Sequence, residues 1–387
     1  MSLAGRSLIS LKDLTTAEIL YVLDVAGKMA TAIGFDDPSR RTPVRPLDRI
    51  LASLFFEPST RTRLSFDSAM LRLGGQVLGF ADPSASSVQK GETLADTIRM
   101  AAGYSDIIVI RHPRAGAARV AAESASVPVI NAGDGPHEHP TQTLTDLFCI
   151  QRNRGTLSGL RVGLCGDLKY GRTVHSLGPI MARFGSDIVC VSPPELRMPA
   201  EFMDGIAQIG GKRPTELHSL EEALPNLDIL YMTRVQRERF DSPEEYERVR
   251  GCFILTPELM ALAPEDSLVL HPLPRVDEIS TAVDEDPRAK YFEQAAGGVP
   301  IRMALIAALL GVNERGHAKG SFRLDAGESG RPQEAEPAEP DRQPVERVVP
   351  GVRCSNPKCV VSTESYLEPL VYEHDGGLRC AYCEQIV

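Results

Sequence analysis

The sequence lacks features that would each define a class of protein. No stretch of the 387 residues approaches the 18 uninterrupted apolar residues expected of a transmembrane helix, and the first twenty residues hold no apolar segment flanked by a cleavage site. An excess of basic residues is also absent, because the formal net charge is −10. That charge disfavours a surface built for nucleic acid or anionic membranes. We therefore expect a soluble, cytoplasmic protein without nucleic-acid or membrane partners, in which local basic residues bind any anionic ligand.

A dinucleotide-binding fingerprint is missing as well. The stretch "GDLKYG" at residues 166–171 does not match the G-x-G-x-x-G pattern that places a pyrophosphate at a helix start. The missing pattern gives little support to a nucleotide cofactor, and no organic cofactor is expected.

From about residue 50 the chain alternates short apolar, β-rich runs with segments of helical periodicity. This alternation predicts parallel sheets flanked by helices, and the region is too long for one compact sheet. "TQTLTDLFCIQRNRG" predicts a helix that leaves a first α/β unit shortly before a new strand at Leu160. The expected fold is α/β, with two doubly wound parallel-sheet domains, and ligands are expected at the carboxyl ends of their strands. The predicted divisions are residues 1–145, 146–290, a C-terminal helix at 291–312 that returns to the first domain, a flexible Pro/Glu-rich linker at 313–346, and a small domain at 347–387.

The eight cysteines fall into two groups. The first group is scattered among hydrophobic neighbours and is expected to be reduced and buried: Cys149, Cys165, Cys190 and Cys252. The second group forms a C-x4-C and a C-x2-C pair within the last 34 residues: Cys354, Cys359, Cys380 and Cys383. Four thiolates at this spacing predict a closed, structural zinc site. A domain of this size needs the metal to fold.

The stretch "FFEPSTRTRLSF" at residues 55–66 predicts an anion site. An apolar strand ends at Glu57-Pro58 and a helix begins near Ser59, so free backbone N–H groups and the positive end of the helix dipole meet there. The planar guanidinium of Arg61 matches phosphate oxygens. Taken alone, the stretch is also compatible with an ordinary N-cap next to a surface arginine.

Other polar residues follow predicted strands or precede predicted helices. They are Ser86, Lys90, Arg111, His139, Gln142, Arg172, Arg234, Gln236 and the turn "HPLPRVDE" at residues 271–278. Each of them alone has a structural explanation, as a helix-start residue, a surface charge or part of a salt bridge.

In chain order these stretches resemble the catalytic chain of the aspartate carbamoyltransferases across roughly residues 5–312. The matching blocks are "FFEPSTRTRLSF", "KGETLADT", "RHP", "NAGDG", "HPTQTLTDLF", "GDLKYGRTVHSL", "LYMTRVQ" and "HPLPRVDEI". The resemblance implies a carbamoyl-phosphate-binding domain followed by an aspartate-binding domain. It also implies the conversion of carbamoyl phosphate and L-aspartate to N-carbamoyl-L-aspartate and phosphate, an early step of de novo pyrimidine biosynthesis.

The resemblance also implies roles for individual residues. It places carbamoyl phosphate against Ser59, Thr60, Arg61, Thr62, Ser86, Lys90, Arg111, His139, Gln142, Pro272 and Leu273. It places aspartate against Lys90, Arg172, Arg234 and Gln236. Those expected to act in catalysis are Arg61, Thr62, Lys90, Arg111, His139 and Gln142. Ser86 and Lys90 are expected to reach the site of a neighbouring subunit, which implies a homotrimer with shared active sites and leaves a larger assembly of trimers open.

"CSNPKC" and "CAYC" resemble the zinc-binding domain of the regulatory chain of the same enzymes. The larger nucleotide-binding domain of that chain is missing, so nucleotide regulation stays open, and docking of the zinc domain on the catalytic domains is expected. Two alternatives remain. One is a carbamoyltransferase for another amino acid, and the other is a non-catalytic scaffold of a pyrimidine-pathway complex.

Overall fold

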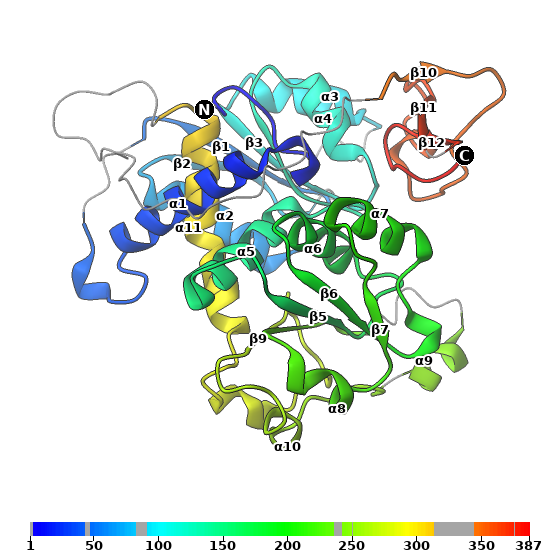
Figure 1. Cartoon of the computed structure of the whole chain (residues 1–387). Helices are drawn as coiled ribbons and strands as arrows, with labels where there is room; N and C mark the ends of the chain where they lie inside the picture. The colour runs from blue at the N-terminus through cyan, green and yellow to red at the C-terminus, as the bar shows by residue number, and fades with distance from the viewer. Residues whose placement is uncertain are drawn as a thin grey trace. The chain divides into compact units, whose positions relative to one another are not determined.

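The computed structural model describes residues 3–42, 47–82, 91–235, 242–249, 251–312, 344–374 and 376–387 (Figure 1). Ser86, Lys90, Gln236 and most of the predicted linker at 313–346 lie outside the described residues. The chain divides into two compact units, which are unit 1 (Met1–Thr141 with Val299–Val387) and unit 2 (Gln142–Gly298). Within the described part of the chain, no helix combines the length and the apolar character that crossing a membrane requires.

Unit 1 is built on a four-stranded parallel sheet with the order β2-β1-β3-β4. Its strands are β1 (Ile50–Phe55), β2 (Gln76–Phe80), β3 (Ile107–His112) and β4 (Val129–Asp134). β1 and β4 are buried almost throughout, as is typical of parallel strands covered on both faces. Because all four strands are parallel, their carboxyl ends share one edge, and β1 and β3 are central in it.

The helices of unit 1 begin at recognisable capping residues. Thr15 and Glu18 form a reciprocal capping box at the start of α1, and Thr93 caps α3 by accepting from the Asp96 N–H group. The helices are α1 (Thr16–Ala32), α2 (Thr60–Arg72), α3 (Leu94–Ala102), α4 (Ala117–Ser124) and the second half of α11 (Tyr291–Leu309). α11 packs on α2, where the Arg302 guanidinium lies 4.9 Å from the centre of the Phe66 ring.

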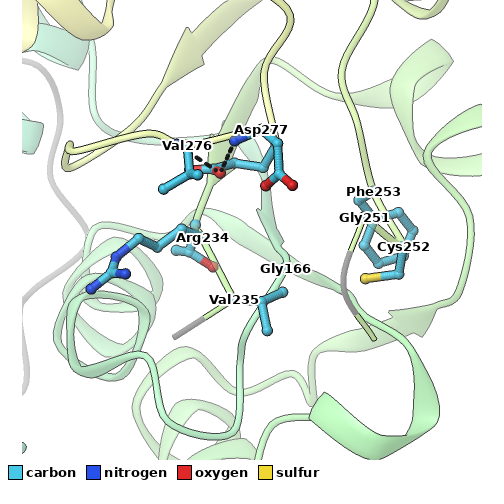
Figure 2. A pocket seen from close by; sticks show the side chains of 10 residues that line it. Gly166, Arg234, Val235, Gly251, Cys252, Phe253, Val276 and Asp277 are labelled. Carbon is cyan, nitrogen blue, oxygen red and sulfur yellow. Dashed lines mark hydrogen bonds between the residues drawn. The ribbon is translucent and has the colours of Figure 1, made fainter. Parts of the chain in front are cut away.

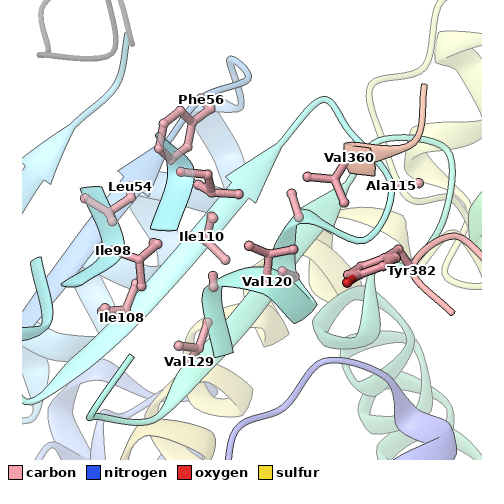
Figure 3. Close-up of a cluster of buried hydrophobic side chains, with 14 of the residues drawn as sticks. Leu54, Phe56, Ile98, Ile108, Ile110, Ala115, Val120, Val129, Val360 and Tyr382 are labelled. Carbon is pink, nitrogen blue, oxygen red and sulfur yellow. The ribbon is translucent and has the colours of Figure 1, made fainter. Parts of the chain in front are cut away.

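The cysteine module, residues 347–387, belongs to unit 1 and contains an antiparallel sheet. Its strands are β10 (Arg347–Val348), β11 (Leu370–His374) and β12 (Gly377–Cys380). The module packs on α3 and α4, and Figure 3 shows Val360 and Tyr382 beside Ala115 and Val120 in one hydrophobic cluster. Backbone hydrogen bonds of 2.9 Å join Ala115 to Lys358 and to Val360.

Gly116, the first residue before α4, makes this packing possible. Its φ is +84°, and a Cβ atom there would lie only 2.6 Å from the carbonyl oxygen of Tyr382. A residue without a side chain is therefore required both by the backbone conformation and by the approach of the module.

Unit 2 contains a five-stranded parallel sheet with the order β7-β6-β5-β8-β9. The strands are β5 (Arg161–Cys165), β6 (Asp187–Val191), β7 (Thr215–Leu217), β8 (Ile229–Met232) and β9 (Leu268–Leu270). The helices are α6 (Arg172–Arg183), α7 (Ala200–Gly210), α8 (Leu220–Ala223), α9 (Pro243–Val249), α10 (Pro257–Met260), most of α5 (Pro140–Arg154) and the first part of α11. The predicted fold class, two parallel-sheet α/β domains with a C-terminal cysteine cluster, is confirmed.

One expectation about the cysteines is wrong. Cys149, Cys165 and Cys190 are buried, but Cys252 is exposed. It follows Gly251, whose φ of +68° places the chain in a surface turn before Leu255. The apolar residues after Cys252 in the sequence therefore do not bury this residue as a whole.

Candidate active site and candidate metal centre

The predicted anion site lies at the carboxyl end of β1. The chain leaves the strand through Glu57 and Pro58, and Ser59 is the N-cap of α2 with φ −158° and ψ 92°. Within the described residues the Ser59 side chain makes no capping hydrogen bond, and Thr62 in the first turn is buried. The N–H groups of a first helical turn have no acceptor within the helix, so this turn presents donors and the positive end of the dipole to an anion.

Arg111 lies beside this helix start, at the end of the neighbouring strand β3. It pairs in register with Phe55, and its carbonyl oxygen accepts from the Phe56 N–H group at 2.8 Å. The guanidinium lies 2.9 Å from Glu57 and 3.3 Å from the carbonyl oxygen of Ala132. Burial lowers the pKa of Arg111, and the Glu57 carboxylate opposes that shift.

The Nε atom of Arg111 is buried and has no hydrogen-bond partner among the described residues. A buried, unpaired N–H group is costly, and it is compensated when an anion binds. Glu57, which forms the ion pair with Arg111, was not predicted from the sequence. Its only signal in the sequence is its place as a carboxylate directly after a buried strand.

His139 follows β4, the other neighbour of β3, and is buried. Its Nδ1 atom lies 3.5 Å from the Thr141 hydroxyl, which lies 3.5 Å from an amino group of Arg302. The structure therefore places three predicted groups, the start of α2, Arg111 and the His139 turn, after adjacent strands of one sheet edge.

Gln142 belongs to unit 2, where a buried carboxylate fixes its amide. The Gln142 side chain donates to Asp146 at 2.7 Å, and Gln294 and the Tyr231 hydroxyl donate to the same carboxylate at 2.6 and 3.0 Å. Burial, together with the Asp146 carboxylate, raises the pKa of Tyr231 well above its usual value. Sequence analysis did not single out Asp146, although its position four residues after Gln142 on a helix was a usable signal.

The two arginines assigned to aspartate lie at the carboxyl ends of neighbouring strands of unit 2. Arg172 is the first residue of α6 after β5, and Arg234 follows β8, which pairs with β5. Asp167 connects the two loops, because its N–H group donates to the Thr233 hydroxyl at 3.0 Å and its carboxylate accepts from the Tyr170 N–H group at 2.9 Å.

Arg234 lines a cavity of about 50 Å³ together with Gly166, Cys252, Asp277 and Glu278 (Figure 2). Figure 2 shows the Arg234 side chain extending away from Cys252. The volume is that of a small water site, so the cavity does not enclose an amino-acid ligand.

Pro272 and Leu273 lie in the turn that follows β9. The His271 ring fixes this turn, since its Nδ1 atom accepts from the Leu273 N–H group at 2.8 Å and its Nε2 atom contacts Glu278 at 2.6 Å. Glu278 also accepts from the Val276 N–H group at 3.1 Å. The carbonyl groups of Pro272 and Leu273 are thus part of a braced turn.

The four C-terminal cysteines form one cluster. All four Sγ atoms lie within 4.8 Å of one another, with Cys354 and Cys383 at 3.4 Å and Cys359 and Cys380 at 3.8 Å. Zinc–sulfur bonds of about 2.3 Å in a tetrahedron separate the sulfurs by about 3.8 Å. The cluster therefore fits a metal ion such as zinc, and four thiolates leave no open position for catalysis.

Two parallel-sheet α/β units, each with cationic side chains at the carboxyl edge of its sheet, are typical of the class of α/β proteins that bind anionic ligands at strand ends. Two family models match the chain: "Aspartate/ornithine carbamoyltransferase, carbamoyl-P binding domain" over residues 6–152 and "Aspartate/ornithine carbamoyltransferase, Asp/Orn binding domain" over residues 158–309. The chain belongs to the aspartate/ornithine carbamoyltransferase family. The cysteine module lies outside both matched ranges.

Similar proteins agree with this assignment. The aspartate carbamoyltransferase catalytic subunit of Methanopyrus kandleri is 53% identical over 313 residues, covering 80% of this chain and 99% of its own. That of Methanosarcina barkeri is 54% identical over 315 residues, covering 81% and 100%. Among solved structures, the catalytic subunit of M. jannaschii aspartate transcarbamoylase has a TM-score of 0.73 at 47% identity, covering 80% of this chain and 99% of its own. The Trypanosoma cruzi enzyme in complex with N-(phosphonacetyl)-L-aspartic acid has a TM-score of 0.74 at 41% identity, covering 80% and 97%.

Proposed function

We propose that this chain is an aspartate carbamoyltransferase that converts carbamoyl phosphate and L-aspartate to N-carbamoyl-L-aspartate and phosphate, an early step of de novo pyrimidine biosynthesis. The observation that carries the proposal is the match, at more than 50% identity, to catalytic subunits of this name over 99% and 100% of their length. The reaction needs no covalent nucleophile. The aspartate amino nitrogen bonds to the carbonyl carbon, the bond from that carbon to the phosphate oxygen breaks, and the amine loses one proton.

The chain's contribution is to hold two anions and to stabilise charge on the carbonyl oxygen. Residues 1–145 form the carbamoyl-phosphate domain of this proposal. Ser59, Thr60, Arg61 and Thr62 bind the phosphate with Arg111. Thr62, Arg111 and His139 polarise the carbonyl oxygen, while Gln142 and the carbonyl groups of Pro272 and Leu273 hold the carbamoyl nitrogen. Two features support these roles: the Nε atom of Arg111 and the start of α2 lack hydrogen-bond partners from side chains in the described part of the chain.

In residues 146–290, the aspartate domain, Arg172, Arg234 and Gln236 bind the aspartate carboxylates. Two arginines near the carboxyl ends of paired strands support this role. Cationic side chains of this kind repel one another when no anion is bound, and an anionic substrate offsets that repulsion.

Ser86 and Lys90 complete the site of a neighbouring subunit, so the working assembly is a homotrimer. The test uses two inactive variants, Arg61→Ala and Lys90→Ala, assayed separately and after mixing in equal amounts under exchange conditions. Partial recovery of turnover on mixing supports shared sites, because some sites then contain neither substitution. A mixture as inactive as its components would contradict them.

The cysteine module binds structural zinc and resembles the zinc domain of the regulatory chain of these enzymes, fused here to the catalytic chain. The sulfur geometry supports zinc as the metal. When bound, the metal supplies cross-linking of four thiolates and no catalytic chemistry.

The decisive assay offers carbamoyl phosphate with either aspartate or ornithine to the zinc-loaded full-length chain and measures both products by mass. We expect N-carbamoyl-aspartate alone. Citrulline instead would identify a carbamoyltransferase for another amino acid, and no product in a correctly assembled preparation would favour a scaffold.

A further inference from the structure

Glu384, the residue after the last clustered cysteine, has an unusual backbone conformation. Its φ is +59°, and its N–H group donates to the Cys380 carbonyl oxygen at 2.9 Å, which closes the turn of the Cys380–Cys383 pair. Left-handed backbone of this kind suits glycine, whereas a residue with a side chain adopts it at a cost. Since a glycine would satisfy the turn, a glutamate at this position calls for a reason in its side chain.

The Glu384 side chain leaves the module and reaches two residues of the adjoining α/β part of unit 1. One carboxylate oxygen lies 2.5 Å from the Lys12 ammonium and 3.8 Å from Nε2 of His137. This Nε2 atom is buried and forms no hydrogen bond within the described residues. The 3.8 Å separation is an electrostatic contact and is longer than a hydrogen bond.

His137 belongs to the turn that carries His139. Its other ring nitrogen lies 3.0 Å from the buried Asp134 carboxylate, which also accepts from the N–H groups of Gly116 at 2.9 Å and Glu138 at 3.0 Å. Asp134 therefore joins the turn to the start of α4, the element on which the cysteine module packs.

Lys12 forms a second connection to the same turn. Its ammonium lies 3.8 Å from the Glu138 carboxylate, which accepts from the Ser10 hydroxyl at 3.3 Å. Glu384 thus contacts the turn through His137 directly and through Lys12 to Glu138, and these two residues immediately precede His139.

We propose that Glu384 is a positioning residue by which the cysteine module holds the 134–138 turn, and with it His139, in the geometry for carbamoyl transfer. The inference rests on the proposed function, in which His139 polarises the carbonyl oxygen. Through this contact the metal-bound module becomes part of the catalytic apparatus of the domain on which it packs. Loss of the module's fold releases the turn without removing any residue from the site.

The test compares Glu384→Gln with Glu373→Gln in the zinc-loaded full-length chain. Glu373 is a matched control, because its carboxylate is exposed and pairs with Arg347 inside the module. For Glu384→Gln we expect kcat to fall about 5- to 20-fold while KM for carbamoyl phosphate changes less than about 2-fold, since a displaced polarising group affects the transition state more than substrate binding. In the same variant, hydrogen exchange should increase in peptides spanning 131–142, and zinc content should stay at the wild-type level. The control Glu373→Gln should match the wild type in kcat, hydrogen exchange and zinc content.

Lys12→Met tests the same connection without touching the cysteine turn. We expect a similar loss of kcat. In the double variant with Glu384→Gln, kcat should be no more than about 2-fold below that of either single variant, because the two residues act as one pair. Wild-type kcat and unchanged exchange over 131–142 in both single variants would overturn the proposal. If the wild-type chain makes no N-carbamoyl-aspartate, the proposed function fails, and the exchange measurement still reports whether Glu384 and Lys12 hold the turn.

Discussion

The α/β part of unit 1 and the cysteine module share one hydrophobic cluster but contribute to it very unequally. β1 and β4 are almost entirely buried, whereas β10 is exposed and β11 and β12 each have one buried residue. Apart from its clustered cysteines, the module contributes Val360 and Tyr382 to the buried core of this cluster. The sheet therefore owes its stability to buried apolar surface, while the module has little core of its own and, on the proposal of bound zinc, needs its metal as well as the face it packs against.

The two regions also differ in how they hold their ligands. The carboxyl edge of the sheet presents hydroxyl, guanidinium and N–H groups, which bind an anion reversibly. The module presents four clustered sulfurs suited to holding a metal ion permanently. Experiments that perturb one kind of site at a time test whether the two regions are stabilised differently.

The largest effect should follow metal removal. Stripping zinc with a chelator removes a contribution of about 10–16 kcal/mol to the folding of a module with little core of its own, and Cys380→Ser, which leaves three of the four thiolates, removes part of it. We expect limited proteolysis to cut within 344–387, while a fragment that contains both parallel sheets survives.

Cys252→Ser is the matched control for Cys380→Ser, because Cys252 is exposed and lies outside the cluster. It should leave zinc content and the proteolysis pattern unchanged. A metal-free module that stays resistant to protease, with metal loss verified by elemental analysis, would show that docking alone folds it and would remove the contrast with the sheet.

The second effect concerns the anion site and should spare both folds. Arg111→Ala removes the guanidinium that pairs with Glu57 beside the start of α2, and the loss of one such donor typically costs about 2.7–4 kcal/mol of transition-state stabilisation. We expect kcat/KM to fall about 100- to 1,000-fold with zinc content unchanged. Arg99→Ala is the control, since Arg99 pairs with Asp96 on the exposed surface of α3. An Arg111→Ala enzyme with more than half of the wild-type kcat/KM would exclude Arg111 from the site.

The parts of this molecule that the sequence predicts well are those determined by neighbours along the chain. Ser59 at a helix start and the cysteine spacings each depend on a few consecutive residues, as does the alternation of strands and helices that gives the fold class. The structure confirms this fold class.

The contacts that sequence analysis missed include pairs of residues that are distant in the chain. Glu57 contacts Arg111, Tyr231 donates to Asp146, and Glu384 contacts Lys12 across 372 positions. A single sequence holds no local pattern for such pairs. The wrong expectation for Cys252 has the same origin, because apolar neighbours in sequence do not decide which way a turn faces.

The smallest effect expected is a difference in acid sensitivity. Burial lowers the pKa of His112 in unit 1 and of His175 in unit 2 to about 4, so both rings stay neutral in the folded chain below the usual histidine pKa of 6.5. Between pH 6.5 and 4 the unfolded chain binds more protons than the folded chain, so stability is lost as pH falls. The loss is at most about 1.4 kcal/mol per pH unit for each histidine. The urea midpoint of unfolding, followed by circular dichroism, should fall as the pH is lowered from 7 to 5. The midpoint of His175→Gln should fall less steeply with pH than that of the wild type.

The module should respond to acid for another reason, because protons compete with zinc for its thiolates. Excess zinc at pH 5 should therefore restore protection from hydrogen exchange in peptides from β12 and leave peptides from β1 and β5 unchanged, since no metal ligand is involved in keeping His112 and His175 neutral. Equal rescue of the sheets by zinc would mean that their stability also depends on the metal, and the division between a sheet held by apolar burial and a module held by coordination would fail. If the urea midpoint of His175→Gln fell with pH as steeply as that of the wild type, His175 would be excluded as a cause of the acid sensitivity.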